Sequence, residues 1–275
     1  MRPVCFISDF GLADDFVGTC KLVVTSVAPD IRVVDLTHEV PSFGVEVGAE
    51  ILQHATRYAP ADAVYLAIVD PGVGTKRRAV ALRASSGAIM VGPDNGLLLP
   101  AADSLGGVVE AVVLTEDRYH IHPVSNTFHG RDMFAPVAAY LASGVDMSEV
   151  GENLEPNSLA ELRLPDAAET GDGAELSTRI ISIDRYGNAR LSIMQDEAGF
   201  EYNATLTVDT GDGGMAVKYV DTFGSAKAGE LILVPDSHWR LSLAINRGSA
   251  AHALGLKVGG RVRIQPPDGP EDARA

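Results

Sequence analysis

Residues 63–72 read Ala-Val-Tyr-Leu-Ala-Ile-Val-Asp-Pro-Gly, an apolar run that ends in a carboxylate and a turn. Such a run predicts a strand buried on both faces, as in a parallel sheet. In open α/β sheets ligands bind at the carboxyl ends of the strands, so Asp70 stands where a site is expected. The Pro-Gly turn then returns Arg77 toward Asp70. Asp70 and Arg77 either brace this turn or belong to a site. The sequences of other segments distinguish these two interpretations.

The segments around this strand alternate between apolar runs and helical patterns. Further strands are predicted at residues 3–8, 31–36, 79–83 and 88–91, the last two flanking a Ser-Ser-Gly turn. Helices are predicted after Asp14-Asp15, around the apolar positions of 45–55, and over 133–141. We therefore predict an α/β protein whose N-terminal layered domain, residues 1–165, holds a mostly parallel sheet.

The composition changes after residue 165. Residues 166–175 are polar and contain glycine, which predicts a linker. Short apolar strands separated by turns follow at 179–183, 204–208, 231–234, 241–244 and 261–264. This pattern is typical of a small all-β, barrel-like domain, which we place at 176–266. Residues 267–275 are expected to form a disordered tail.

The composition excludes several classes of function. Thirty-seven acidic residues against 22 basic ones give a net charge of −15, so the surface should repel nucleic acid and anionic membranes. No apolar run is long enough to span a membrane, and no signal peptide precedes the first strand. We therefore expect a cytoplasmic protein. Cys5 and Cys20 lie in apolar segments and are expected to be buried thiols.

Motifs for common cofactors are missing. There is no P-loop, and residues 72–77 lack the third glycine of a dinucleotide fingerprint. Neither a nucleophile elbow nor a zinc-protease pair is present. His120, His122 and His129 offer three imidazoles, but no carboxylate or cysteine at matched spacing completes the set, so no metal is expected.

Five polar segments follow the predicted strands or precede a helix, at 8–15, 37–41, 70–77, 92–98 and 128–132. Polar groups that converge at one edge of a sheet are typical of a small-molecule site. Together with residues 183–188 and 246–251, their order resembles the S-adenosyl-L-methionine (SAM) hydroxide adenosyltransferases, the hydrolase branch related to fluorinase and chlorinase. The resemblance covers nearly the whole chain.

The resemblance implies a catalytic set of Asp70, Arg77 and His129. It implies that Asp9 binds the ribose diol, since one carboxylate accepts two hydroxyl protons side by side, and that Phe43 lines the ligand. The substrate contacts that it implies in the second domain are Asp184, Tyr186, Asn188, Ser237, Asn246 and Arg247.

The implied reaction is attack of water on ribose C5′ of SAM, which gives adenosine and methionine. SAM is then the substrate, no cofactor is required, and a homotrimer with inter-subunit sites is implied. The methionine leaves as a neutral thioether, so no general acid is needed. Either Asp70 or His129 receives the proton from water. The charge of Arg77 weakens Asp70 as a base but stabilises hydroxide-like charge on the attacking oxygen.

Two alternative functions remain. The first is a SAM-dependent halogenase, but that branch carries a tyrosine at Asp70, a serine at Gly130 and an inserted loop within 83–89. Because a carboxylate repels a halide, these departures favour water as the nucleophile. The second is a non-catalytic module that binds an adenosyl ligand, which would keep Asp9 and Asn188 equally well. Retention of the complete catalytic set counts against it, and a turnover assay separates the three.

Overall fold

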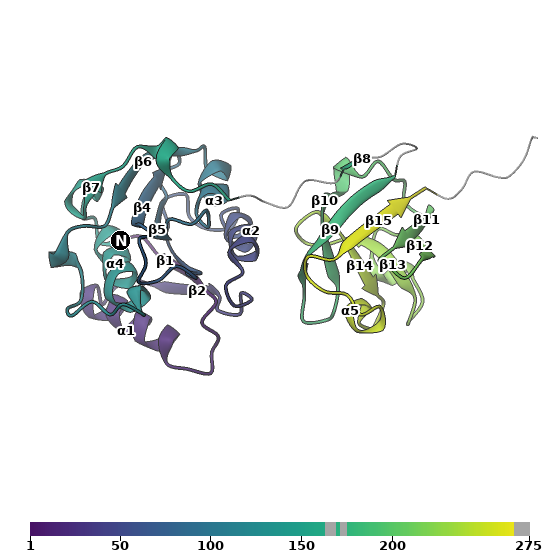
Figure 1. Cartoon of the computed structure of the whole chain (residues 1–275), viewed down its shortest axis with the longest axis horizontal. Coiled ribbons are helices and arrows are strands. Elements are labelled where there is room, and N and C mark those ends of the chain that lie inside the picture. The colour runs from purple at the N-terminus through teal and green to yellow at the C-terminus, as the bar shows by residue number, and fades with distance from the viewer. Residues whose placement is uncertain (163–168, 171–174, 267–275) are drawn as a thin grey trace, which may run out of the picture. The chain divides into compact units, whose positions relative to one another are not determined.

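The computed structural model describes residues 1–162, 169–170 and 175–266 and divides into two compact units, Met1–Arg163 and Leu164–Ala275 (Figure 1). The predicted linker at 166–175 falls, apart from residues 169–170 and 175, outside the described residues, as does the predicted tail at 267–275.

The first unit is built on a seven-stranded sheet in the order β2-β1-β3-β5-β4-β6-β7. The strands are β1 (Val4–Ser8), β2 (Val33–Thr37), β3 (Val64–Ile68), β4 (Ala79–Ala84), β5 (Ile89–Pro93), β6 (Val108–Val113) and β7 (Glu152–Asn153). The predicted parallel arrangement is confirmed for β2, β1, β3 and β5. β4 pairs antiparallel with β5 because only a short turn joins them, and β6 and β7 extend this antiparallel half.

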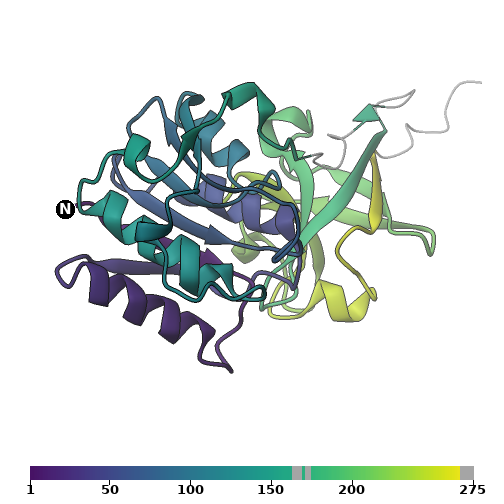
Figure 2. The same ribbon diagram turned by 60° about the vertical axis from the view of Figure 1, so that its left-hand side comes forward.

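Helices cover both faces of this sheet. α1 (Phe16–Val27) and α4 (Ala135–Ala142) lie on one face, and α2 (Val45–Ala55) and α3 (Leu99–Ser104) lie on the other (Figure 1, Figure 2). Successive residues of β1 therefore enter different cores: Phe6 packs on the α1/α4 side and Ile7 on the α2/α3 side. This two-sided burial explains the continuous apolar runs. Cys5 and Cys20 are buried free thiols, as predicted, and burial raises the pKa of Cys20 to about 12.

The second unit is a closed seven-stranded barrel, which confirms the predicted all-β, barrel-like domain. Its strands are β9 (Leu176–Ile183), β10 (Ala189–Met194), β11 (Thr205–Asp209), β12 (Gly214–Tyr219), β13 (Leu231–Pro235), β14 (Arg240–Ile245) and β15 (Arg261–Gln265). The barrel closes because β10 pairs with β14 on one side and with β9 on the other. β8 (Glu169–Thr170) pairs with β9 outside this ring. Alternate strand residues such as Leu191, Val208 and Leu243 fill the interior.

Shorter helical turns connect these elements. They are η1 (Asp117–Tyr119), η2 (Gly130–Phe134, a π-helical turn), η3 (Met147–Glu149), η4 (Pro156–Ser158), η5 (Gln195–Glu197), η6 (Phe223–Ser225) and α5 (Ala250–Ala253). None of the helices in the described part of the chain has both the length and the apolar composition that a membrane crossing requires.

Candidate active site

The parallel strands of the first unit bring polar residues to one edge of the sheet. β1 is followed by Asp9, β2 by His38, β3 by Asp70 after Val69, and β5 by Asp94. Because these strands share one direction, their carboxyl ends meet at the same edge, where α/β proteins bind ligands. The structure therefore gathers residues that lie far apart in the sequence.

Asp70, Arg77 and His129 form one contiguous cluster. Arg77 Nε donates to Asp70 Oδ1 at 3.0 Å, and Arg77 Nη2 donates to the other carboxylate oxygen. The same Nη2 lies 3.1 Å from His129 Nδ1. The side chains of Asp70 and Arg77 are only 7% and 8% exposed. This is a buried, bidentate ion pair with an imidazole attached, and a surface brace of the turn would be far more exposed.

A glycine turn places Arg77 in this cluster. Thr75 donates to the Gly72 carbonyl through its backbone N–H at 3.1 Å and its hydroxyl at 2.7 Å. Gly74 adopts a left-handed φ of 72°, and a Cβ on it would lie 2.2 Å from the carbonyl oxygen of Asn126. Only glycine fits this close approach. The turn is thereby packed against the segment that leads into His129.

The ring of His129 has a defined tautomer when neutral. A guanidinium only donates, so His129 Nδ1 must accept from Arg77 and the proton must reside on Nε2. Burial, followed by the charge of Arg77, lowers the pKa of His129 from its ordinary 6.5. Among the described residues, Arg77 Nη1 is a buried donor without a hydrogen-bond partner. With Nδ1 turned to Arg77, the N–H at His129 Nε2 is the donor that the ring can offer to a ligand oxygen.

Asp9 and Phe43 also lie together. Asp9 Oδ2 accepts a hydrogen bond of 2.8 Å from the backbone N–H of Phe43. Phe43 lies in a tight turn, closed by Gly44 N–H donating to the Pro41 carbonyl at 2.8 Å, and has a φ of 65°. Glycine normally occupies such a position, because a left-handed backbone conformation costs an L-residue with a side chain about 1–2 kcal/mol. The aromatic side chain is nevertheless 70% exposed, and a strained, exposed aromatic is typical of a ligand contact.

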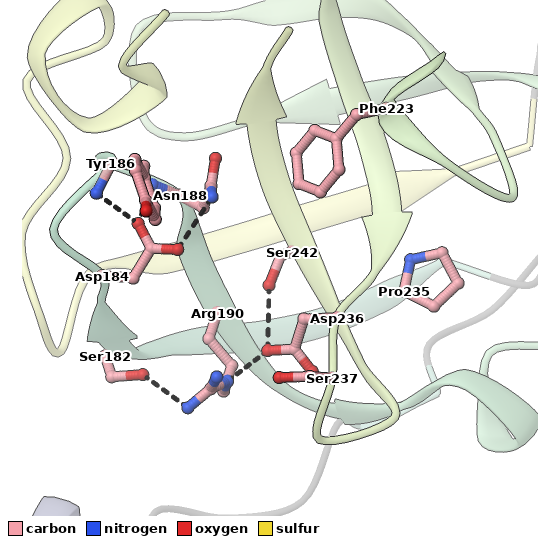
Figure 3. Close-up of a pocket in the computed structure, with 10 residues that line it drawn as sticks. All are labelled: Ser182, Asp184, Tyr186, Asn188, Arg190, Phe223, Pro235, Asp236, Ser237 and Ser242. Carbon is pink, nitrogen blue, oxygen red and sulfur yellow. Dashed lines mark hydrogen bonds and ion pairs between the residues drawn. The ribbon is translucent and has the colours of Figure 1, made fainter. Parts of the chain in front are cut away.

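Four of the residues predicted in the second unit line one pocket of the barrel. Its volume is about 280 Å³, and Figure 3 shows its lining. Asp184 organises the turn there, because its Oδ1 accepts from the backbone N–H groups of Tyr186 at 2.8 Å and Asn188 at 3.0 Å, and its Oδ2 accepts from Asn188 Nδ2. Ser237 lies on the opposite strand connection, after β13.

The other two predicted residues, Asn246 and Arg247, are not among those that line this pocket. Asn246 Nδ2 donates to the carbonyl of Ala226 at 2.8 Å, which ties together two loops of the barrel. Arg247 is exposed and has a left-handed φ of 58°. In the described structure Asn246 thus has a structural bond, and Arg247 lies on the surface.

The pocket also contains a charged pair that sequence reasoning missed. Arg190 Nε donates to Asp236 Oδ2, and Arg190 Nη1 donates to Ser182 Oγ at 3.3 Å (Figure 3). Ser242 Oγ donates to the same Asp236 oxygen at 3.4 Å. The available signal was an aspartate directly after an apolar strand, the same pattern that drew attention to Asp70.

No metal centre emerges from the histidines. His120 Nδ1 lies 3.7 Å from Asp117 Oδ1, and His122 Nε2 lies 3.0 Å from the Asp117 carbonyl oxygen, while His129 contacts Arg77. Within residues 1–162, 169–170 and 175–266, no three His, Cys, Asp or Glu side chains are grouped so that they could hold a metal ion.

Comparison with known proteins identifies the family to which the chain is similar. Residues 4–151 match the model of the SAM hydroxide adenosyltransferase N-terminal domain, and residues 178–263 match that of the C-terminal domain. The chain belongs to this family. Two relatives named (R)-S-adenosyl-L-methionine hydrolase, from Salinispora tropica and Salinispora arenicola, are 44% and 41% identical, each over 95% of this chain and 97% of the relative.

Structural and more distant comparisons agree with membership of the adenosyltransferase family. The crystal structure of an uncharacterized conserved protein from Thermotoga maritima superposes with a TM-score of 0.88 at 31% identity, covering 95% of this chain and 99% of that one. A protein named fluorinase, from Actinopolyspora mzabensis, is 31% identical over 96% of this chain and 97% of its own length. The hydrolases are thus the more similar relatives.

Gly130, where the family resemblance implies a serine in the halogenase branch, is tightly packed in this structure. A Cβ on Gly130 would lie 3.1 Å from Phe10, 3.2 Å from Phe128 and 3.3 Å from Ile68. Phe10, Phe16 and Phe128 pack edge to face, with ring centroids 5.0–5.8 Å apart. A serine side chain would force this aromatic cluster to move, so the packing here is built around glycine.

Proposed function

We propose that this chain hydrolyses SAM to adenosine and methionine by attack of water on ribose C5′. The observation that carries the proposal is the buried cluster of Asp70, Arg77 and His129 at the carboxyl edge of the sheet. These residues are the ones that the family resemblance assigns to catalysis. The greater similarity to hydrolases than to fluorinases supports water as the nucleophile.

The donors and acceptors of the cluster suit a water molecule. His129 Nε2 would donate to one lone pair of the water oxygen, the other lone pair would face C5′, and a free lone pair of the Asp70 carboxylate would accept one of the water hydrogens. Because Nε2 already carries a proton in the neutral ring, we assign the proton-accepting role to Asp70. A carboxylate is a weak base, so the proton moves only as the C–O bond forms.

The chemistry then needs no acid and no metal. As the water oxygen bonds to C5′, the C–S bond breaks and its electron pair returns to sulfur, which leaves as the neutral thioether of methionine. The proton from water passes to Asp70 and then to solvent. Positive charge moves from sulfur toward the attacking oxygen, where the Asp70 carboxylate stabilises it. Alignment of oxygen, carbon and sulfur by the bound substrate supplies a further part of the rate acceleration.

We further propose that the protein works in the cytoplasm as a homotrimer with inter-subunit sites and needs no cofactor. Support for such assembly comes from the two aromatic residues assigned to the ligand, Phe43 and Tyr186, which are each 70% exposed within the single chain. In the proposed trimer a neighbouring subunit would cover these side chains around the bound ligand. Sedimentation of the purified protein tests the trimer.

The test of the proposed reaction is incubation with SAM in ¹⁸O-water, with and without chloride, and mass analysis of the products. We expect the label in the 5′-oxygen of adenosine at both chloride concentrations. A 5′-chloro product would move the protein to the halogenase branch. Binding of SAM without any product would leave the non-catalytic module as the correct interpretation.

The pH dependence of turnover should report His129. Protonation of Nδ1 would remove the acceptor that Arg77 uses, so the cluster requires the neutral ring. Because burial and Arg77 lower the pKa of this ring below 6.5, the neutral form persists as the pH falls through 6.5. We expect log(kcat/KM) to remain level down to pH 6.5 and to fall only below it. An acid limb centred above 6.5, or one that persists in His129→Asn, would contradict this assignment.

A further inference from the structure

The loop after β1 and the loop after β2 are joined by hydrogen bonds beyond those of the regular β1–β2 pairing. β1 and β2 pair in register from Val4 to Phe6, but the register shifts between Phe6 and Ile7. Beyond that irregularity, the Val40 N–H donates to the Ser8 carbonyl at 3.4 Å and the Gly11 N–H donates to the His38 carbonyl at 2.7 Å. On its other side β1 stays paired with β3 as far as Ser8 and Ile68, so the irregularity affects only the side of β1 that faces β2, just before Asp9.

A buried side-chain bond strengthens this junction. Ser8 Oγ lies 2.8 Å from His38 Nδ1, and the two residues are 0% and 3% exposed. The imidazole also packs on the ring of Phe6 at a centroid distance of 4.6 Å. The bond joins the last residue of β1 to the loop after β2, which continues to Phe43 and its hydrogen bond with Asp9. Asp9 is thus enclosed between the Ser8–His38 bond and the Phe43 turn.

The direction of each hydrogen bond in this network follows from its donors. The Phe10 N–H donates to Ser8 Oγ at 3.4 Å, and the Ser8 hydroxyl donates to His38 Nδ1 because the other ring nitrogen lies beside the Asp35 carboxylate, which only accepts. The proton of the neutral ring is then on Nε2, which faces Asp35 Oδ1 at 3.3 Å. Asp35 Oδ2 in turn accepts from Lys21 at 2.8 Å. Ser8, His38, Asp35 and Lys21 thus lie in a row of polar contacts, in which His38 Nε2 is buried at ion-pair distance from Asp35 without a hydrogen bond.

We propose that His38 is a positioning residue that acts through Ser8 to hold the Asp9 carboxylate where it binds the ribose diol. This inference rests on the part of the proposed function that assigns the ribose to Asp9. Neither Ser8 nor His38 needs to touch the substrate. Their bond fixes the backbone on which Asp9 is mounted, while the Phe43 N–H fixes the rotation of its carboxylate.

The test compares the binding of adenosine and of 2′,3′-dideoxyadenosine, which lacks the diol, by calorimetry. The dissociation constant of 2′,3′-dideoxyadenosine divided by that of adenosine measures recognition of the diol. A general loss of structure would weaken both nucleosides and leave this ratio unchanged. The variants are Ser8→Ala, His38→Gln and His38→Asn. The asparagine amide reaches the position of imidazole Nδ1 and keeps a partner for Ser8, whereas the longer glutamine amide approaches the position of Nε2. Thr56→Val is the control, because it removes the hydroxyl of another buried residue, at the far end of α2.

We expect Ser8→Ala and His38→Gln to lower the ratio about tenfold, the effect of one misplaced hydrogen bond, while His38→Asn and Thr56→Val keep it. In SAM turnover the same two variants should raise KM and leave kcat nearly unchanged. An unchanged ratio in Ser8→Ala and His38→Gln would overturn the inference. A wild-type protein that discriminates the nucleosides but does not turn over SAM would instead overturn the proposed reaction alone. Failure of the wild type to discriminate them would overturn the assignment of Asp9 and this inference together.

Discussion

Asp70→Asn is expected to lower kcat for SAM hydrolysis by about 10²–10⁴-fold, the usual loss when a general base is removed. The asparagine side chain keeps the shape of the carboxylate but cannot take the proton from water. It also removes the negative charge that stabilises the attacking oxygen as it becomes positive. SAM should still bind, since the ribose and methionine contacts are unchanged. Single-turnover kinetics with a calorimetric dissociation constant separate these two effects.

His129→Asn provides the comparison for that result. Its amide oxygen can still accept from Arg77 at the position of Nδ1, and only the Nε2 donor to the water is lost, so we expect a smaller loss than in Asp70→Asn, which removes the proton acceptor. The opposite order would indicate that the imidazole, and not the carboxylate, takes the proton. A loss of less than tenfold in Asp70→Asn would remove Asp70 from the chemistry altogether.

Arg77→Leu is expected to cost about 3–5 kcal/mol of unfolding free energy, because it leaves the Asp70 carboxylate buried without its partner. Activity should be lost as well, since the bonds that orient Asp70 and His129 both disappear. Urea denaturation measures the stability. Arg83→Leu is the matched control, because its ion pair with Glu110 is 26% and 33% exposed and should contribute only about 0–1 kcal/mol.

The double variant Asp70→Asn with Arg77→Leu sharpens this prediction. Removing both charges leaves no unpaired ion in the interior, so we expect it to be more stable than Arg77→Leu alone. Strictly additive losses would mean that the two side chains contribute independently. Equal costs for Arg77→Leu and Arg83→Leu would contradict the buried character of the pair.

The elements that the sequence predicted best are those with uninterrupted apolar runs. β1 and β3 are buried on both faces, and two-sided burial selects such runs. β12 was not predicted, because its sequence Gly-Met-Ala-Val-Lys-Tyr contains few strand-favouring residues and depends on its neighbours in the barrel. β10 does alternate buried Ala189, Leu191 and Ile193 with polar residues, a signal that was overlooked. α3 has six residues, too few for a helical period to show.

The contacts of the site also differ in how far they could be predicted. Those within one turn follow from the local sequence, whereas those between distant residues depend on the fold. The proximity of Asp70 and Arg77 followed from a single turn. His129 is 52 positions beyond Arg77, and its approach depends on Gly74 meeting Asn126 across the structure. The Ser8–His38 bond likewise spans 30 positions. No local pattern encodes such contacts, so only the family resemblance brought His129 into the catalytic set before the fold was described.

The left-handed Phe43 has a consequence for engineering this protein. A library screened only for heat resistance should enrich glycine at this position, since glycine relieves the backbone strain and little apolar burial is lost from a ring that is 70% exposed. The variants so enriched would lack an aromatic surface beside Asp9 and should bind the nucleoside less well. Thermal selection on this scaffold therefore needs a simultaneous selection for ligand binding, or it will discard an element of recognition while the fold improves.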